Sequence, residues 1–592
     1  MNDLKLLYLS VIALCILALP AQAQNASNDS TSLKRELTLE REYNPDIDNA
    51  TKVNQLPELR EPQSPKSLIE FSNYAIPYST SPGLYYLPAQ LYASEIAKIK
   101  KIGYVTAGIS SLVDIDGDLG IQLLNTSKDY LSFYASHRSS NSNVNYIHED
   151  GKQKMKINDN WGGIRFLHDF GKARLNLDAK YTYSAFNYYG QTRVIYFLFP
   201  YNSLFAPTEG TTNVDKDKNQ ANNLFEANAG ITSSEMQDIS WLFNFNYRHF
   251  GQKYGQSVGE DGRKENQFKI DAGASYKFND DITFGLLGKL QNFSYSSIDE
   301  RYRDEWSGNL NYTTISLNPH IKMEGSNWNL RLGIKEEFQT GERKKANLSP
   351  DIRFNLKPSN RFMLELSAMG GIKENSNYSM FYENRYVNPA LRVSDSRTPL
   401  NVGLGLDFLM RDNLKLKLSG NYEIIKDEHF FYTYPIFPYS DTHLAGMDMS
   451  VLGLDVNHFK TGLSIDYFYQ NTLEVKLGGA FHNWTNRGSF DGGDFEAYGK
   501  PDFAGDINVG YKMSSLPLRI DAFYHLETGR KFRQTEDENN SINDLSLKGT
   551  YLLNDTFSFY LKANNLLFQE YEFWYGYPAQ SFNIMGGLSI KF

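Results

Sequence analysis

The sequence has a single cysteine, Cys15, in a chain of 592 residues. Cys15 lies in a largely apolar run, residues 6–19, which Lys5 precedes and Ala21-Gln22-Ala23 follows. A charged start, a short apolar run and a small-residue site are typical of a secretory signal peptide and predict cleavage between Ala23 and Gln24. A transmembrane anchor is the alternative, but the run is shorter than the ~20 residues that a spanning helix needs. The mature chain would then contain no cysteine, which excludes disulfides and thiol catalysis.

Net positive charge is also absent, since 69 acidic residues outnumber 60 basic ones. A net charge of −9 excludes nucleic acid as a partner, because phosphate binding needs a basic surface. The sequence contains no His-Glu-x-x-His, glycine-flanked serine elbow, phosphate-binding loop or dinucleotide fingerprint. We therefore expect neither an enzyme nor a cofactor, although a hydrolytic site assembled across strands would leave no local pattern.

Long apolar runs are missing after the signal, and two-residue alternation takes their place. Two clear examples, in which apolar residues alternate with polar ones, are Leu414-Lys415-Leu416-Lys417-Leu418 and Phe557-Ser558-Phe559-Tyr560-Leu561-Lys562. Such a period predicts β-strands with one apolar and one polar face. Many segments run well beyond the about five or six residues common in soluble β-proteins. A membrane β-barrel explains both features, because its strands face lipid on one side and the lumen on the other.

Short and long connections alternate between these segments. The tight links include Gly171-Lys172, Asn279-Asp280-Asp281, Arg411-Asp412-Asn413 and Asn554-Asp555, and the long ones are 191–221, 377–396, 433–457 and 487–500. Short periplasmic turns and long outer loops are expected of outer-membrane barrels, and the segments number about 22. We predict an all-β fold, a transmembrane antiparallel barrel over residues 102–592, with 24–101 as a short periplasmic or lumenal segment.

The last strand alternates most strictly. Its apolar face contains Phe582, Ile584, Leu588, Ile590 and Phe592, and its other face contains Asn583, Met585, Ser589 and Lys591. We expect the first face to contact outer-membrane lipid and the second to line the lumen. A strand that closes on an aromatic residue predicts that Phe592 is the signal that the barrel assembly machinery engages during biogenesis.

The carboxy-terminal region resembles that of TonB-dependent receptor barrels. The resemblance rests on Ala563-Asn564-Asn565-Leu566-Leu567, Tyr571, Tyr575-Gly576-Tyr577-Pro578 and the final strand ending at Phe592. Ala579-Gln580-Ser581 stands where those receptors often have an arginine. The richness in tyrosine and asparagine is similar to that of outer-membrane proteins of Bacteroidota. The resemblance implies a location in the cell outer membrane and a role in substrate passage or binding.

Such receptors have a larger amino-terminal plug domain inside the barrel, whereas only residues 24–101 are available here. The prolines in this segment, from Pro45 to Pro88, predict an extended chain. We therefore expect no full plug, and a lumen closed by this segment, by inward-folded loops such as 191–221, or by a partner. A different class of function stays open, namely a plugless barrel that serves as a subunit of an outer-membrane assembly or secretion complex and contacts surface or periplasmic proteins.

Aromatic residues gather in the predicted loops. We expect a binding surface formed by Tyr196, Phe199, Tyr201, Tyr382, Tyr432, Tyr434, Phe437, Tyr439, Trp574 and Tyr575. Large exposed aromatic patches usually mark interfaces. The alternative assigns the rings nearest the strands to the aromatic girdle at the membrane interface.

Overall fold

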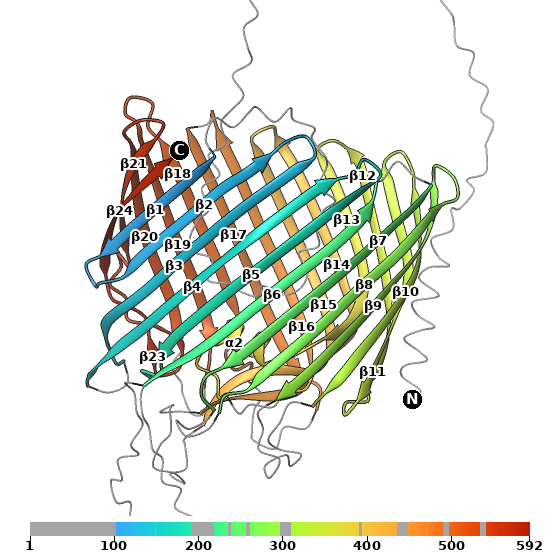
Figure 1. The fold of residues 1–592 in the computed structure, drawn as a ribbon, viewed down its shortest axis with the longest axis horizontal. Helices are drawn as coiled ribbons and strands as arrows, with labels where there is room; N and C mark the ends of the chain where they lie inside the picture. Colours follow the sequence, from blue (N-terminus) through green and yellow to red (C-terminus); the bar gives the residue numbers. More distant parts are fainter. Residues whose placement is uncertain are drawn as a thin grey trace, which may run out of the picture. The chain divides into compact units, whose positions relative to one another are not determined.

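The computed structural model describes residues 102–147, 150–190, 218–234, 238–255, 261–296, 310–389, 393–434, 448–470, 472–488, 496–532 and 540–592. Within them, 22 strands form one closed antiparallel sheet (Figure 1). The predicted barrel and its number of strands are confirmed. The predicted signal peptide, the segment 24–101 and the expected lack of a plug concern residues outside this part of the chain.

The barrel strands follow one another in chain order. They are β1 (Gly103–Ser110), β2 (Ile115–Asn125), β3 (Asp129–Asn145), β4 (Lys152–Asp169), β5 (Ala173–Asn187), β6 (Asn219–Ser233), β7 (Ile239–Gln252), β8 (Lys264–Lys277), β9 (Ile282–Ser296), β10 (Tyr312–Glu324), β11 (Trp328–Gly341), β12 (Ala346–Ser359), β13 (Phe362–Lys373), β14 (Ser396–Arg411), β15 (Leu414–Tyr434), β16 (Asp448–Tyr469), β17 (Leu473–Asn486), β18 (Phe503–Lys512), β19 (Leu518–Arg530), β20 (Asn540–Leu552), β21 (Phe557–Asn564) and β24 (Asn583–Lys591). The links between strands hold α2 (Asn377–Glu383), between β13 and β14, and a small ribbon of β22 (Glu572–Trp574) and β23 (Tyr577–Pro578), between β21 and β24.

The sheet closes between its first and last strands. β1 pairs antiparallel with β24, with Gly108 opposite Gly587. The Phe592 carbonyl accepts hydrogen bonds from the N–H groups of Ile102 at 2.7 Å and Gly103 at 2.9 Å, and the Phe592 N–H donates to Gly103 at 2.9 Å. Each barrel strand therefore has two neighbours, as hydrocarbon requires of backbone polar groups.

Tight turns such as those after β4 and β20 lie at one end of the barrel, and the links that hold α2 and β23 lie at the other (Figure 1). The turn after β4 closes with a 2.8 Å bond from the Phe170 N–H to the Ala173 carbonyl, and the turn after β20 with a 3.0 Å bond from Leu553 to Phe557. The carboxy terminus lies at the tight-turn end. α2 and β23 lie at the other end, which we call the loop end.

One predicted loop is shorter than expected. The range 433–457 is strand over much of its length, because β15 continues to Tyr434 and β16 begins at Asp448. Phe431 pairs with Val451, which extends the ladder beyond the membrane-length core of the two strands. The sequence prediction assigns residues 448–457 to the loop, but they pair with β15 and belong to the strand ladder.

The two faces of the strands are sorted as predicted. On β21, Phe557, Phe559 and Leu561 are exposed on the outer face, and on β24 Ile584 and the adjoining Phe592 are exposed likewise. The alternating residues between them line an interior cavity, and all but Met585 are polar: Ser558, Tyr560, Lys562, Asn583, Met585, Ser589 and Lys591. The barrel thus presents an apolar exterior and a polar lumen. Among the described residues, no helix is long and apolar enough to cross a bilayer.

A tyrosine lies across the closing seam on the lumen side. A side chain at Gly587 or at Gly108 would collide with the ring and hydroxyl of Tyr560, so the ring occupies the space above these two paired glycines. The missing side chains thus allow an aromatic ring to cover the backbone of β24 and β1.

We predict that Gly587→Ala destabilises the folded barrel by about 1–3 kcal/mol, because the new methyl group must displace Tyr560. Gly586→Ala is the matched control, since a side chain at Gly586 would meet nothing within 4 Å. The measurement is the temperature at which the folded, fast-migrating form on a gel converts to the unfolded form. Equal conversion temperatures for the two variants would contradict the packing argument.

Candidate functional site

The lumen contains a cavity of about 1300 Å³ walled mainly by β14–β21, β24, β1 and β2. Its wall has nine basic side chains and six carboxylates, although the chain as a whole is acidic. The basic residues are Lys373, Lys417, Lys460, Lys500, Lys512, Arg519, Lys548, Lys562 and Lys591, and the acidic residues are Asp116, Asp118, Glu423, Glu428, Asp506 and Asp544. Within a low-dielectric wall this excess disfavours free cations in this half of the lumen.

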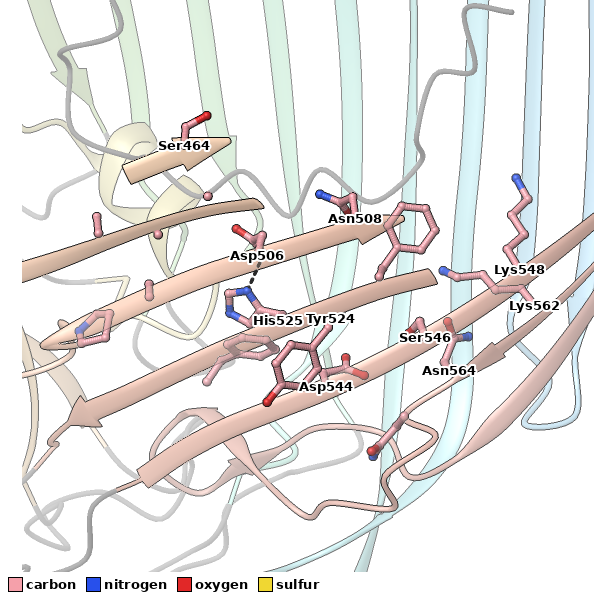
Figure 2. Close-up of a pocket in the computed structure, with 18 of the residues that line it drawn as sticks. Ser464, Asp506, Asn508, Tyr524, His525, Asp544, Ser546, Lys548, Lys562 and Asn564 are labelled. Carbon is pink, nitrogen blue, oxygen red and sulfur yellow. Dashed lines mark hydrogen bonds and ion pairs between the residues drawn. The ribbon is translucent and has the colours of Figure 1, made fainter. Parts of the chain in front are cut away.

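His525 is held between two carboxylates in this wall. Its Nδ1 lies 2.7 Å from Asp506 of β18, as Figure 2 shows, and its Nε2 lies 3.2 Å from Glu527. Glu527 is fully buried and accepts two hydrogen bonds from Arg530, at 3.0 and 2.6 Å. Arg530 also donates to the carbonyl of Gly499 at 2.5 Å, which fixes the link between β17 and β18 against the wall.

A second histidine network lies on β15–β17. His458 contacts Glu423 through Nδ1 and His482 through Nε2, both at 2.9 Å. The His458 ring stacks on Trp484 at 3.7 Å, and the Lys500 ammonium lies 4.5 Å from the same indole ring. Each polar side chain is therefore oriented by its neighbours, which gives a rigid wall.

A second cavity, of about 540 Å³, lies along β5–β9. Its lining is almost entirely polar, with asparagine and glutamine predominant. Glu374, which directly follows β13, reaches this cavity and bonds Lys289 at 2.9 Å. The two cavities together give the lumen a polar lining on both sides.

The loop end of the lumen is covered by two inward-folded segments, which we call the cap. The first cap loop comprises residues 374–389 and 393–395 with α2, and the second comprises 565–582 with β22 and β23. In α2, a capping box starts the helix: the Ser376 hydroxyl accepts from the Ser379 N–H at 3.2 Å, and the Ser379 hydroxyl accepts from the Ser376 N–H at 2.7 Å.

The first cap loop is anchored by two residues in the second half of α2. The Phe381 ring packs between Phe186 at 5.7 Å and Phe250 at 5.5 Å. Glu383 bonds His429 of β15 at 2.8 Å. Burial raises the pKa of Glu383, but the charge and hydrogen bond of His429, with Lys373, outweigh this and lower the pKa to about 2. The anchor therefore contributes stability above the pKa of an unfolded glutamate and loses it as the pH falls towards 2.

The first cap loop then reaches the opposite wall. Arg385 pairs with Asp159 of β4 at 2.9 Å, and the guanidinium lies 5.8 Å from the Phe186 ring. β4 belongs to the other side of the closed sheet from β13 and β14, which flank the loop. The loop therefore spans the lumen.

The second cap loop meets the first through tyrosines. The rings of Tyr577 and Tyr386 stack at 3.8 Å, and Tyr189 packs edge-on against both, at 5.2 and 5.6 Å. All three rings are buried. Left-handed backbone at Asn565 and Phe568, with φ of 49° and 55°, turns the second loop away from β21. The stacked rings therefore join the two cap loops at the loop end of the barrel.

The residues of the predicted aromatic binding surface differ in their exposure. Tyr382 lies on α2 and is 49% exposed. Trp574 packs between Phe431 and Phe532, and Tyr575 is buried against Phe532, so both rings stabilise the cap instead of forming an exposed surface. Tyr196, Phe199, Tyr201, Phe437 and Tyr439, and the side chains of Tyr432 and Tyr434, lie outside the described part of the structure.

Sequence reasoning missed the residues that join the two cap loops. Tyr386, Arg385 and Asp159 show no local pattern, because their contacts join segments far apart in the chain. The sequence indicates Tyr577 only as part of the Gly576-Tyr577-Pro578 sequence and does not indicate its contact with Tyr386. In the described residues no group of three or more histidine, aspartate or glutamate side chains could hold a metal ion.

A closed 22-strand barrel with an apolar exterior and a capped polar lumen defines an outer-membrane β-barrel. No protein-family model matches the sequence, and no curated protein matches it. Solved structures do share the fold. The FrpB iron transporter from Neisseria meningitidis (F5-1 variant) aligns with a TM-score of 0.60 at 12% identity over 83% of this chain and 82% of its own.

A mutant ferric enterobactin receptor from Pseudomonas aeruginosa, in complex with enterobactin, aligns with a TM-score of 0.59 at 11% identity, over 83% of this chain and 81% of that one. The copper transporter OprC aligns with a TM-score of 0.55 at 11% identity, over 83% and 82%. These proteins are TonB-dependent receptors. The likeness confirms the predicted fold, a TonB-dependent-receptor-like barrel.

Proposed function

We propose that the protein binds a polar solute in its lumen and lets it cross the outer membrane when the cap opens. The observation that carries this proposal is the cap itself. Two loops from opposite sides of the sheet meet in a Tyr386–Tyr577 stack above a polar cavity of about 1300 Å³. Barrels of about 16–18 strands already leave an aqueous channel, so a larger barrel needs such a closure.

The comparisons support passage over catalysis. The neighbours with this fold are named as transporters and receptors, among them an iron transporter and a copper transporter. Both wall networks, around His525 and around His458, are bonded within the wall itself, which suits a lining more than a reacting group. We propose no enzyme activity for the lumen.

The proposal also gives roles to residues 1–101. A signal peptide removed between Ala23 and Gln24 would export the chain, and the segment 24–101 would serve as a reduced plug beneath the cap. The alternative role, as a subunit of an assembly or secretion complex, stays a prediction. Purification from native membrane distinguishes the two, because a stable multi-protein complex joined through the loop end supports the alternative.

The test of the proposed function is the entry of neutral solutes into proteoliposomes, measured by osmotic swelling. We expect Tyr386→Ala combined with Tyr577→Ala to raise the swelling rate several-fold over the parent protein, because the substitutions remove the rings that join the cap loops. Tyr551→Ala is the control, since Tyr551 is exposed on the outer face of β20.

Equal swelling rates for the parent, the double variant and the control would contradict a role of the cap in passage. If removal of residues 24–101 from the double variant also leaves the swelling rate equal to that of the parent protein, passage through the lumen is contradicted altogether. Each variant is first shown to fold by its heat-modifiable migration on a gel.

A further inference from the structure

The cavity along β5–β9 has an unusual lining. Six of its residues have carboxamide side chains, namely Asn176, Asn228, Asn244, Asn246, Gln267 and Gln291. A carboxamide offers two N–H donors and a carbonyl acceptor within one planar group. The wall therefore presents many donors and acceptors side by side on neighbouring strands.

Each charged side chain of this wall has an ion-pair partner, although Glu226, the partner of Arg248, is not part of the lining. Lys269 bonds Asp271 at 3.0 Å, and Lys289 bonds Glu374 at 2.9 Å. Arg248 bonds Glu226 at 3.1 Å and donates to Gln267 at 2.9 Å. The lining has three cations, Arg248, Lys269 and Lys289, and two carboxylates, Asp271 and Glu374, so its excess is one positive charge. This excess is smaller than that of the basic cavity along β14–β21.

Part of the hydrogen-bonding capacity of the carboxamides is unused. Asn246 donates to Asn228 at 2.7 Å. The Oε1 atom of Gln291 is buried without a hydrogen-bond partner, in a side chain only 5% exposed that lines the cavity. The Asn244 carbonyl lies over Gly230, where any side chain would collide with it. Buried polar atoms of this kind are costly unless a partner binds them, so Gln291 points to a ligand with a hydroxyl or amide donor.

An aromatic platform stands beside this wall. Tyr382 of α2 is about half exposed, and its ring lies 5.7 Å from that of Tyr378. Tyr378 is held over the Arg248 guanidinium at 4.3 Å, and Arg248 itself lines the cavity. The first cap loop therefore brings an exposed aromatic face next to the carboxamide wall.

We propose that this wall and Tyr382 form a binding site for a neutral, polyhydroxylated ligand, that is, a saccharide. Hydroxyl groups both donate and accept, which matches carboxamides, and the C–H face of a sugar ring packs on an aromatic ring. The charged side chains of the lining are already ion-paired, which disfavours selection of an ion, and the shortage of apolar side chains in the lining disfavours an apolar ligand. The inference rests on the proposed function and names the class of solute.

The test is isothermal titration of the purified full-length protein in detergent with neutral hexasaccharides of glucose, mannose, galactose or xylose. Titrations use the parent protein and the Tyr386→Ala/Tyr577→Ala variant, because the cap closes the lumen. We expect at least one hexasaccharide to bind. Tyr382→Ala and Asn246→Ala should each weaken that binding about tenfold.

Asn329→Ala is the matched control, because Asn329 lies on β11 and is not among the residues that line either cavity. It should leave the affinity unchanged. Binding of none of the four hexasaccharides, or equal weakening by the control and by Tyr382→Ala, would overturn the proposal. Titration in detergent measures binding and does not depend on passage across a membrane. Sugar binding without faster swelling of the cap variant would therefore reject the proposed function alone. Faster swelling without sugar binding would reject this binding site alone.

Discussion

Deletion of Phe592 is expected to prevent most of the protein from reaching its folded, heat-modifiable form. The residue forms three backbone hydrogen bonds at the seam, with Ile102 and Gly103, all at 2.7–2.9 Å. Its ring packs on Gly103, at 2.8 Å from the position a Cβ would take, and is 44% exposed on the outer face. Without these contacts β1 and β24 end in an open edge, and unpaired backbone groups in a bilayer cost several kcal/mol each.

Two further variants separate the contributions of Phe592. Phe592→Ala keeps the backbone bonds and removes the ring, which we propose is what the barrel assembly machinery engages. Lys591→Gln is the control, because Lys591 faces the lumen. Gel migration with and without heating measures the folded fraction in membranes. The prediction fails if the Phe592 deletion folds as completely as Lys591→Gln.

Replacement of Arg530 should produce the largest loss of stability among single substitutions in the wall. Arg530→Met removes both hydrogen bonds that Arg530 donates to the fully buried Glu527 carboxylate and releases the Gly499 carbonyl. Removing one partner of a buried ion pair typically costs about 3–5 kcal/mol. The measurement is unfolding in urea, followed by the loss of the folded band.

The matched control is an exposed ion pair in the same barrel. Arg174 and Asp169 lie 3.4 Å apart with side chains 65% and 38% exposed, so Arg174→Met should cost no more than about 1 kcal/mol. A double variant, Arg530→Met with Glu527→Leu, should be more stable than Arg530→Met alone, because it also removes the buried carboxylate that has lost its arginine. A double variant less stable than the single one would contradict this account of the pair.

The barrel could be predicted from the sequence because its rules are local. Phe557, Phe559 and Leu561 face outward, and Ser558, Tyr560 and Lys562 face inward, as period-2 alternation requires. Turn-forming residues such as Gly171-Lys172 marked the tight end. Closure then followed from the need to pair every backbone group in lipid.

The cap could not be predicted, because its contacts join distant parts of the chain. Nothing near Tyr386 indicates that its ring stacks on Tyr577, or that Arg385 reaches Asp159. The sequence pattern of a loop aromatic residue does not show whether its side chain is buried, as that of Tyr575 is, or exposed, as that of Tyr382 is. The histidine networks were equally hidden, since His458 and His482 lie on different strands and meet only through the register of β16 and β17.

The most direct test of the central claim is to lock the cap. Because the mature chain is predicted to have no other cysteine, Tyr386→Cys with Tyr577→Cys can be joined by a short cleavable bis-maleimide. Single-channel recording is then made on the same protein with the linker intact and after its cleavage. The account predicts little conductance while the loops are joined and a clear rise after cleavage; the same large, steady conductance in both states would contradict a lumen that the cap closes.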